Sequence, residues 1–207
     1  MPARGRFITL EGVDGAGKST HVAFIADAMR ARGAHVVTTR EPGGTPLAER
    51  LRELVLTTPM SDTSELLLMF AARADHVDSV VRPALARGDW VLSDRFTDAT
   101  FAYQGGGHGV DGARIETLAR WVHDDVRPDV TILFDVPPGV SRARLADASR
   151  RGRELDRFER EKEDFVARVR DVYAARARAE PARFRVVDSA RPLAAVRAEL
   201  AAIVDAL

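Results

Sequence analysis

A glycine-rich segment near the start of the chain has the residue types and the spacing of a phosphate-binding loop. Two glycines lie five positions apart and are followed by a lysine and a small hydroxyl residue, a pattern that cradles phosphates. The segment reads Gly12-Val13-Asp14-Gly15-Ala16-Gly17-Lys18-Ser19. Glycines let backbone N–H groups turn toward phosphate oxygens, and a helix that follows adds its positive end. The segment therefore predicts a phosphate site in which Lys18 reaches the outer phosphates and Ser19 ligates magnesium.

The use of lysine at position 18 supports this interpretation. Lys18 and Lys162 are the two lysines of the chain, so the other 29 of its 31 basic residues are arginines. A chain that otherwise prefers arginine keeps lysine where a compact point charge is needed, because a planar guanidinium fits poorly there. Lys162 lies between Glu161 and Glu163, and we interpret it as a solvated helix residue.

Short apolar runs alternate with helical patterns, and these elements must position the loop. Strands are expected at residues 7–10, 35–39, 90–93, 130–136 and 184–187. Helices are expected from residue 18, over 64–87 and 113–125, up to residue 178 and over 192–207. Strands separated by helices predict an α/β fold with a mostly parallel, five-stranded sheet that is covered by helices on both faces.

Composition limits the function classes. A length of 207 residues suits one domain, 1–207. The absence of cysteine excludes disulfides, thiolate metal sites and thiol catalysis. The 31 basic and 31 acidic residues cancel, so we expect neither nucleic acid nor a membrane as a partner. The first apolar run, Phe7–Leu10, is too short for a signal peptide or a membrane span, so we expect a cytoplasmic protein.

A phosphate loop alone is compatible with a GTPase, a motor or other ATPase, or a small-molecule kinase. The usual guanine-reading signature needs an asparagine, and this chain has none. Mechanical and remodelling ATPases are usually longer than 207 residues. Many arginines outside the loop favour transfer of phosphate between two small anions, that is, a kinase.

Further segments follow the loop in a characteristic order. After 7–12 and 14–20 come Thr39-Arg40-Glu41-Pro42-Gly43-Gly44-Thr45, Leu68-Met69-Phe70-Ala71-Ala72-Arg73-Ala74, Ser93-Asp94-Arg95-Phe96, Ala102-Tyr103-Gln104-Gly105-Gly106-Gly107 and Asp156-Arg157-Phe158-Glu159. Together they resemble the bacterial thymidylate kinase family over most of the chain. The resemblance implies a three-layer phosphate-loop kinase fold with a small Arg-rich lid at about 148–158.

The resemblance also implies roles for the residues around the loop. Those that hold ATP are Gly12, Val13, Asp14, Gly15, Ala16, Gly17, Lys18, Ser19 and Thr20, with Arg150 and Arg151 from the lid. Asp14 contacts the 3′-hydroxyl of the acceptor sugar, and Arg95 bridges the donor and acceptor phosphates. Asp94 helps Ser19 to hold hydrated magnesium. Arg153 joins Lys18, Asp14 and Arg95 as a catalytic residue, although any of the three lid arginines could reach the transferring phosphate; an exposed charged loop is the alternative for the lid.

The implied dTMP site draws on several segments. Its residues are Asp14, Arg40, Glu41, Pro42, Arg52, Met69, Phe70, Arg73, Arg95, Tyr103, Gln104, Asp156 and Phe158. Arg73 hydrogen-bonds a base carbonyl, the ring of Tyr103 presses on the deoxyribose, and the amide of Gln104 meets the base.

Three of these assignments have alternatives. Relatives often carry the stacking aromatic four positions before the arginine, so either Met69 or Phe70 covers thymine, and core packing is the alternative for both. Tyr103, with its three glycines, could instead anchor a turn. Arg52 could be a solvated helix residue.

The expected reaction is transfer of the γ-phosphate of ATP to dTMP, giving dTDP and ADP for dTTP synthesis. The acceptor oxygen is already anionic, so Lys18, Arg95, a lid arginine and Mg²⁺ need only neutralise and align two anions. The alternatives are a kinase for another nucleoside monophosphate and a nucleotide-binding regulatory ATPase. The resemblance further implies a homodimer, with the helix over 64–87 as its contact.

Overall fold

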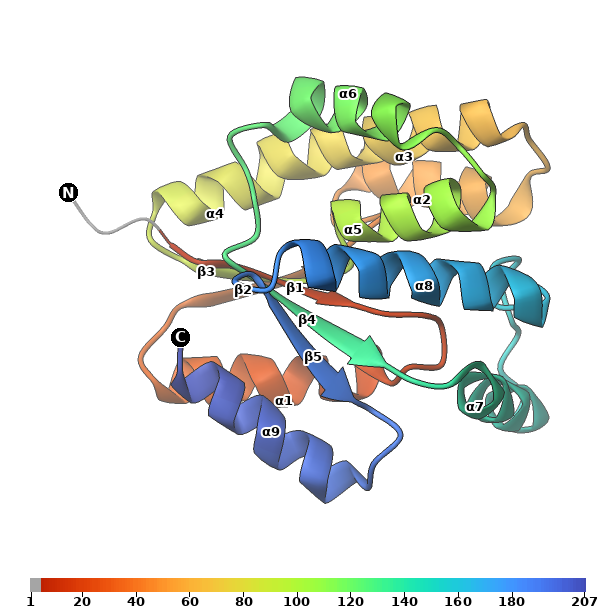
Figure 1. The fold of residues 1–207 in the computed structure, drawn as a ribbon. Coiled ribbons are helices and arrows are strands. Elements are labelled where there is room, and N and C mark those ends of the chain that lie inside the picture. Colours follow the sequence, from red (N-terminus) through yellow and green to blue (C-terminus); the bar gives the residue numbers. More distant parts are fainter. Residues whose placement is uncertain (1–4) are drawn as a thin grey trace.

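A five-stranded parallel sheet forms the centre of the protein (Figure 1). The computed structural model describes residues 5–207, so residues 1–4 of the expected domain lie outside it. The strands are β1 Phe7–Glu11, β2 Val36–Arg40, β3 Trp90–Asp94, β4 Val130–Asp135 and β5 Phe184–Asp188. Their spatial order is β2-β3-β1-β4-β5, and every neighbouring pair is parallel. The predicted α/β class and the five strands are confirmed.

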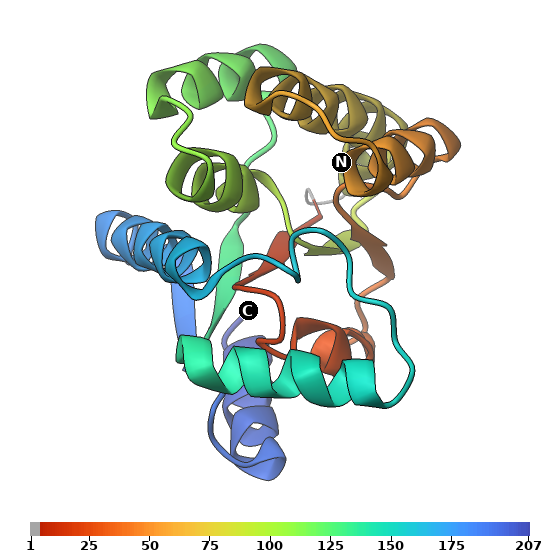
Figure 2. The ribbon, with the colours of Figure 1, turned by 90° about the vertical axis from the view of Figure 1, so that its right-hand side faces the viewer.

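Helices cover both faces of this sheet (Figures 1 and 2). The helices α1 Lys18–Ala31 and α9 Leu193–Asp205 pack together on one face. The other helices are α2 Pro46–Thr57, α3 Asp62–His76, α4 Arg82–Ala86, α5 Thr97–Thr100, α6 Gly112–His123, α7 Pro138–Arg150 and α8 Glu163–Ala179. No helix within residues 5–207 is long and apolar enough to cross a membrane.

The expected helix over 64–87 is longer and less regular than predicted. It begins at Asp62, because the hydroxyl of Ser61 accepts a hydrogen bond from the backbone N–H of Ser64 at 3.2 Å. A π-helical turn, Val77–Val81 (η1), separates α3 from α4. Pro83 lies just beyond this turn and has no N–H to donate, which removes one regular helical bond.

Several other helical segments were not expected from the sequence. The helix α2 starts with Thr45 as N-cap and Pro46 in its first turn, a start signal that the apolar pattern alone does not show. The helix α7 buries a single residue, Ser141, so its sequence has no clear apolar stripe. A second π-helical segment, Phe101–Gly107 (η2), runs through the three glycines after Gln104.

Buried strands β1 and β4 form the centre of the core. All five residues of β1 are buried, and so are the first five of β4. Sheets buried on both faces have such continuous apolar strands. The rigid pair ends at one edge of the sheet, where β1 leads into the glycine-rich loop.

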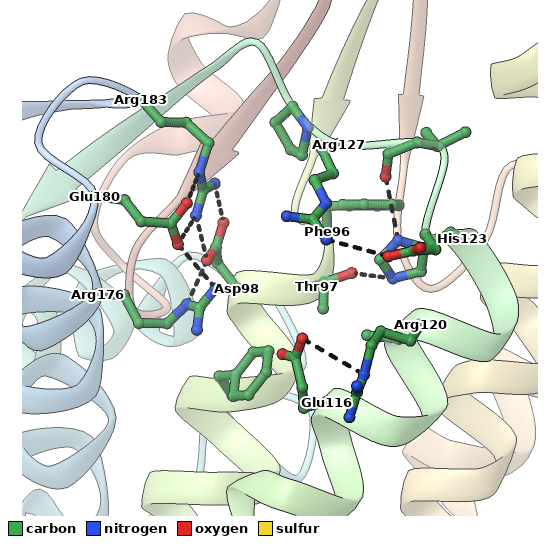
Figure 3. A pocket seen from close by; sticks show the side chains of 15 residues that line it. Phe96, Thr97, Asp98, Glu116, Arg120, His123, Arg127, Arg176, Glu180 and Arg183 are labelled. Carbon is green, nitrogen blue, oxygen red and sulfur yellow. Dashed lines mark hydrogen bonds and ion pairs between the residues drawn. The ribbon is translucent and has the colours of Figure 1, made fainter.

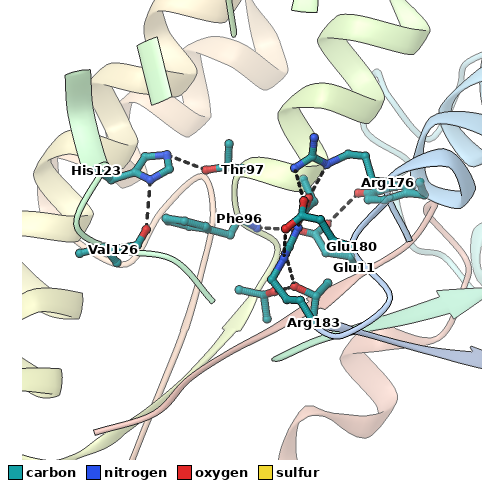
Figure 4. A network of polar contacts seen from close by, with 12 residues as sticks. Glu11, Phe96, Thr97, His123, Val126, Arg176, Glu180 and Arg183 are labelled. Atoms are coloured by element: carbon teal, nitrogen blue, oxygen red, sulfur yellow. Dashed lines mark hydrogen bonds and ion pairs between the residues drawn. The ribbon is translucent and has the colours of Figure 1, made fainter. Parts of the chain in front are cut away.

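Buried His123, at the end of α6, is neutral in the folded protein. Its Nδ1 lies 3.2 Å from the carbonyl oxygen of Val126, and its Nε2 lies 2.7 Å from the hydroxyl of Thr97 (Figure 4). A carbonyl only accepts, so Nδ1 carries the proton and Nε2 accepts from Thr97. Burial, helped by the charge of Arg73, lowers the pKa of His123 to about 4.

This shift predicts an acid-sensitive contribution to stability. The pKa of His123 is lowered from 6.5 to about 4, so below pH 6.5 the unfolded chain binds a proton that the folded chain excludes. The free energy of unfolding should therefore fall by roughly 3 kcal/mol between pH 7 and pH 4 through this residue. Urea unfolding of the wild type and of His123→Gln from pH 7 to pH 4 should show their difference shrinking. A difference that is independent of pH would contradict the assignment.

Candidate active site

The glycine-rich loop joins β1 to α1 and takes a shape that only glycines allow. Gly12 has φ 134°, and a Cβ at this position would lie 2.4 Å from the carbonyl oxygen of Phe134. Gly17 has φ 96° and directly precedes Lys18, the first residue of α1. The loop therefore turns tightly into the helix, whose N-terminal backbone N–H groups favour an anion.

Lys18 lies in this loop with its ammonium group over the backbone. Its Nζ donates to the carbonyl oxygens of Gly12 at 3.0 Å and Val13 at 3.2 Å. Burial and the charge of Arg95 lower the pKa of Lys18, whereas Asp94 and other nearby carboxylates oppose this shift.

A cavity of about 580 Å³ opens above the loop. We name it the phosphate cavity; its lining is Asp14, Gly15, Gly17, Lys18, Ser19, Thr20, Arg40, Glu41, Arg52, Asp94, Arg95, Arg144, Leu145, Ala148, Arg153, Glu154, Asp156 and Glu159. Side chains from distant parts of the sequence meet here because parallel strands present their carboxyl ends at one edge of the sheet.

Arg95 follows β3 and is held in an unusual conformation. Its φ of 74° is the one positive value among the non-glycine residues of 5–207. Its Nη1 donates to the carbonyl of Gly12 at 2.9 Å, and its Nη2 donates to Asp14 at 2.5 Å and to the hydroxyl of Tyr103 at 2.9 Å. Strained backbone of this kind persists where the surroundings hold it, and it often marks a functional residue.

A smaller cavity of about 70 Å³ lies beside the first. We name it the acceptor cavity; its lining is Asp14, Glu41, Pro42, Arg52, Leu56, Met69, Arg95, Ala99, Tyr103, Gln104, Asp156 and Phe158. Asp14 and Arg95 line both cavities. Burial raises the pKa of Asp14, but Arg95 and Lys18 outweigh it and hold the pKa below its usual value. The carboxylate also accepts a 2.7 Å hydrogen bond from Tyr103.

Two adjoining cavities thus share the ion pair of Asp14 and Arg95. A comparison with known protein families identifies the family that has this sequence. A family model described as thymidylate kinase matches residues 10–200. The chain belongs to the thymidylate kinase family. The thymidylate kinase of Bordetella pertussis is 60% identical over 200 residues, which cover 97% of this chain and 94% of that protein. The thymidylate kinase of Methylobacillus flagellatus is 58% identical over 95% of each chain.

A solved structure supports the same assignment. The crystal structure of thymidylate kinase from Ehrlichia chaffeensis has a TM-score of 0.78 and 33% sequence identity to this chain. The match covers 97% of this chain and 98% of that one. The chain is thus a nucleotide kinase with the fold that the sequence predicted.

Two residues that the sequence did not single out fix Arg95 in this member of the thymidylate kinase family. Tyr173, from α8, accepts from Nη1 of Arg95 at 3.2 Å and donates to Glu11 at 2.8 Å. The other oxygen of Glu11 accepts from the backbone N–H of Phe96 at 2.7 Å (Figure 4). Burial, followed by the charge of Asp98, raises the pKa of Glu11 to about 8. An acidic residue at the end of an apolar strand was the signal for Glu11, whereas Tyr173 had none.

Of the two candidates for covering thymine, the structure brings Met69 to the acceptor cavity. Met69 lies four positions before Arg73, on the face of α3 that lines the cavity. Phe70 is buried in a cluster with Leu66 and residues of α6, away from that lining. One helical step turns a side chain by about 100°, which separates these neighbours. Phe70 therefore has the packing role that was its alternative.

Arg73 is buried beside the acceptor cavity, not in its lining. Its Nε donates to Glu41 at 2.7 Å, and its Nη2 donates to Thr100 at 3.0 Å. Its Nη1 is buried and has no hydrogen-bond partner among residues 5–207. The other oxygen of Glu41 lies 2.8 Å from Nδ1 of His76. Burial raises the pKa of Glu41, but Arg73 and His76 outweigh it, so the pKa lies below its usual value.

Of the three arginines predicted to act from the lid, one lines the phosphate cavity. Residues 151–162 connect α7 to α8 without regular structure and pass in front of the phosphate loop (Figure 2). Arg153 lines the cavity and pairs with Glu159. Arg150 and Arg151 are exposed at the end of α7, pair with Asp147 and lie outside the lining.

The remaining predicted arginines, Arg52 and Arg40, both line the phosphate cavity. Arg52 is partly buried on α2, donates to the carbonyl of Pro42 at 3.0 Å and lines both cavities. Arg40 pairs with Glu49 at 2.8 Å and lines the phosphate cavity. Arg144, on α7, was not predicted; its Nη1 donates to the carbonyl of Gly15 at 3.3 Å, and it lines the same cavity. One further arginine in an arginine-rich chain gave no distinctive signal.

Ser19 and Asp94 have the chemistry expected of magnesium donors. Both line the phosphate cavity. Oδ1 of Asp94 is buried and has no hydrogen-bond partner among the described residues. Hydroxyl and carboxylate oxygens suit Mg²⁺, which usually takes one or two protein ligands and completes its shell with phosphates and water. These two residues fit the ion that the family's nucleotide substrate carries.

A third cavity, of about 330 Å³, lies between α5, α6 and α8 (Figure 3). Four arginines line it, and each has an acidic partner. The pairs are Arg120 with Glu116 at 4.0 Å, Arg127 with Asp124 at 3.1 Å, Arg176 with Asp98 at 2.5 Å and Arg183 with Asp98 at 2.6 Å. The pairing neutralises the lining, so this cavity lacks the unpaired positive charge of a phosphate site.

Proposed function

We propose that the chain transfers the γ-phosphate of ATP to dTMP, with ATP on the phosphate loop and dTMP in the acceptor cavity. The observation that carries this proposal is the position of Asp14 and Arg95, which line both cavities and bind each other. Membership of the thymidylate kinase family supplies the substrates. Because ATP is the donor, we place the enzyme in the cytoplasm.

The phosphate transfer requires alignment of the two substrates rather than a general base. Both reacting groups are anions, so repulsion is the main obstacle, and no proton need be removed from the acceptor phosphate. Lys18, Arg95 and Arg153 line one cavity and can neutralise the charge that spreads over the transferring group. Residues 12–20 hold ATP, and we assign Arg150 and Arg151 to the lid, which brings them toward ATP when it closes.

Ser19 and Asp94 would hold Mg²⁺, which offsets phosphate charge when it is bound with ATP. Their position in the phosphate cavity supports this assignment. The unpartnered Oδ1 of Asp94 is available to a water of the ion's hydration shell.

The acceptor cavity suits a deoxyribonucleotide with a small base. Asp14 accepts from the 3′-hydroxyl, and the ring of Tyr103 lies against the sugar, where a 2′-hydroxyl would crowd it. Met69 covers the base, and Arg73 and Gln104 bond to its edge. Glu41, Pro42, Arg52, Asp156 and Phe158 close the remaining walls, and Arg40 adjoins them from the phosphate cavity.

A panel of nucleoside monophosphates tests the proposal. Purified protein with Mg-ATP should produce dTDP and ADP from dTMP far faster than it phosphorylates dCMP, dGMP or AMP. Preference for another acceptor would indicate a kinase of different specificity. Steady consumption of ATP without any acceptor would indicate a regulatory ATPase.

We further propose a homodimer through α3 and α6. Leu67 on α3 is 53% exposed, and Trp121 on α6 is 84% exposed. A groove between these helices includes Leu118, which lies three positions before Trp121 on the same face. Exposed apolar surface of this kind often marks an interface.

Mass measurement in solution tests the dimer. The protein should have twice the 22.7 kDa mass of the chain, and Leu67→Asp should shift it toward the monomer because a buried carboxylate at the interface is unfavourable. Leu193→Asp, on α9 at the opposite face of the sheet, is the matched control and should leave the mass unchanged. A monomeric wild type would refute the dimer.

A further inference from the structure

In the side-chain amide of Gln104, the nitrogen donates a hydrogen bond, whereas the oxygen has no partner among the described residues. It is 1% exposed and lines the acceptor cavity. Its Nε2 donates to Glu65 at 2.6 Å. Its Oε1 is buried and has no hydrogen-bond partner among residues 5–207. Since Glu65 is not part of the cavity lining, the carbonyl oxygen is the one acceptor of this amide, and it remains free for a bound base.

Glu65 determines the orientation of the Gln104 side-chain amide. A carboxylate only accepts hydrogen bonds, so it selects the amino end of Gln104. The reversed amide would place two oxygens together at the 2.6 Å contact. Glu65 is 2% exposed, and its other oxygen pairs with Arg157.

Arg73 supplies a complementary donor beside the cavity. Its Nε and Nη2 are bound to Glu41 and Thr100, and its buried Nη1 is free. Two buried atoms without a hydrogen-bond partner in the described part of the chain thus lie at this end of the site: an acceptor, Oε1 of Gln104 in the cavity lining, and a donor, Nη1 of Arg73 beside it. Thymine and uracil carry an N3–H donor between two carbonyl acceptors. Cytosine carries an acceptor at N3 and an amino group beside it, which opposes this pattern.

We propose that Glu65 is a specificity-determining positioning residue: it fixes the amide of Gln104 so that the site accepts a pyrimidine with N3–H and rejects one with an unprotonated N3. The inference rests on the proposed function, because it requires the acceptor base to lie in the cavity lined by Gln104. Glu65 acts through Gln104 and does not touch the substrate.

A reciprocal exchange of the two side chains tests this role. In Glu65→Gln the residue at 65 can donate or accept, so the amide of Gln104 is no longer fixed. The ratio of kcat/KM for dTMP to that for dCMP should fall by about 10- to 100-fold, the effect of one unpaired buried hydrogen-bonding group. The loss should lie mainly in KM for dTMP, with KM for ATP unchanged.

The double variant Glu65→Gln/Gln104→Glu should regain much of this ratio. Its amide at 65 donates to a carboxylate at 104, which again leaves an acceptor oxygen for N3–H. Gln104→Glu alone should be worse than the double variant, because two carboxylates then face each other. Arg157→Gln is the matched control: it removes the ion pair but keeps the carboxylate at 65, so the ratio should change by less than about threefold.

The outcomes separate this inference from the proposed function. A wild type that does not phosphorylate dTMP refutes the proposed function. A wild type that does so, with an unchanged dTMP to dCMP ratio in folded Glu65→Gln, or a double variant no better than Gln104→Glu, overturns the role of Glu65 alone.

A spectroscopic measurement on the wild type covers the case in which the variants do not fold. Gln104 is the one glutamine of the chain, and asparagine is absent, so its side-chain NH₂ gives a single pair of signals in a ¹H–¹⁵N spectrum. The proposal predicts one proton shifted downfield and slow exchange of this pair with solvent. An unshifted, rapidly exchanging pair would overturn it.

Discussion

Arg95→Ala should lower kcat for phosphorylation of dTMP by about 10²–10⁴-fold, the usual cost of losing a charge that stabilises a transition state. The guanidinium is bound at once to the carbonyl of Gly12 and to Asp14, and its residue lines both cavities. Removing it leaves the repulsion between donor and acceptor phosphates uncompensated where they meet. Steady-state assays of dTDP formation at saturating ATP and dTMP would measure the effect.

Two further variants define what Arg95 contributes. Arg95→Lys keeps the charge but not the planar fork, so it should recover only part of the lost rate. Arg191→Ala removes an arginine that pairs with Glu199 on the surface and should leave turnover unchanged. Near-wild-type turnover in Arg95→Ala would refute the assigned role.

The sequence predicted the parts of this site that lie where strands end. Asp14 and Arg95 follow β1 and β3, which are neighbours in the sheet, so their meeting at one edge follows from the predicted parallel fold. The glycines and Lys18 carry a motif whose residue types are required by the phosphate chemistry. The glycine-rich motif and the order of the strands therefore both predict a site at this edge of the sheet.

Contacts between distant side chains could not be predicted in this way. Tyr173 lies 162 positions from Glu11, yet its hydroxyl fixes both Glu11 and Arg95. Whether Met69 or Phe70 faces the acceptor cavity depends on how α3 is rotated about its axis. An apolar sequence pattern does not predict that rotation to within one residue. Arg144 could not be predicted because the chain has 29 arginines, and nothing in the sequence distinguishes this one from the others.

Lys18→Ala should likewise lower the transfer rate by about 10²–10⁴-fold. The ammonium group lies in the loop within 3.0 Å of the carbonyl of Gly12, and the residue is 6% exposed, so few other cations could take its place. Single-turnover rates with Mg-ATP and dTMP would separate this effect on chemistry from any change in the affinity for ATP.

Lys18→Arg provides the sharper test, because it keeps the charge and changes only its shape. A guanidinium is wider than an ammonium group and binds in a plane, whereas Nζ of Lys18 bonds to two successive carbonyls of a tight loop. We therefore expect Lys18→Arg to remain close to Lys18→Ala in rate. Lys162→Ala, which removes the second lysine from an exposed position, is the control and should retain full activity. A rate near that of the wild type in Lys18→Arg would show that a positive charge of either shape suffices at this position. The presence of lysine here, in an arginine-rich chain, would then have no catalytic explanation.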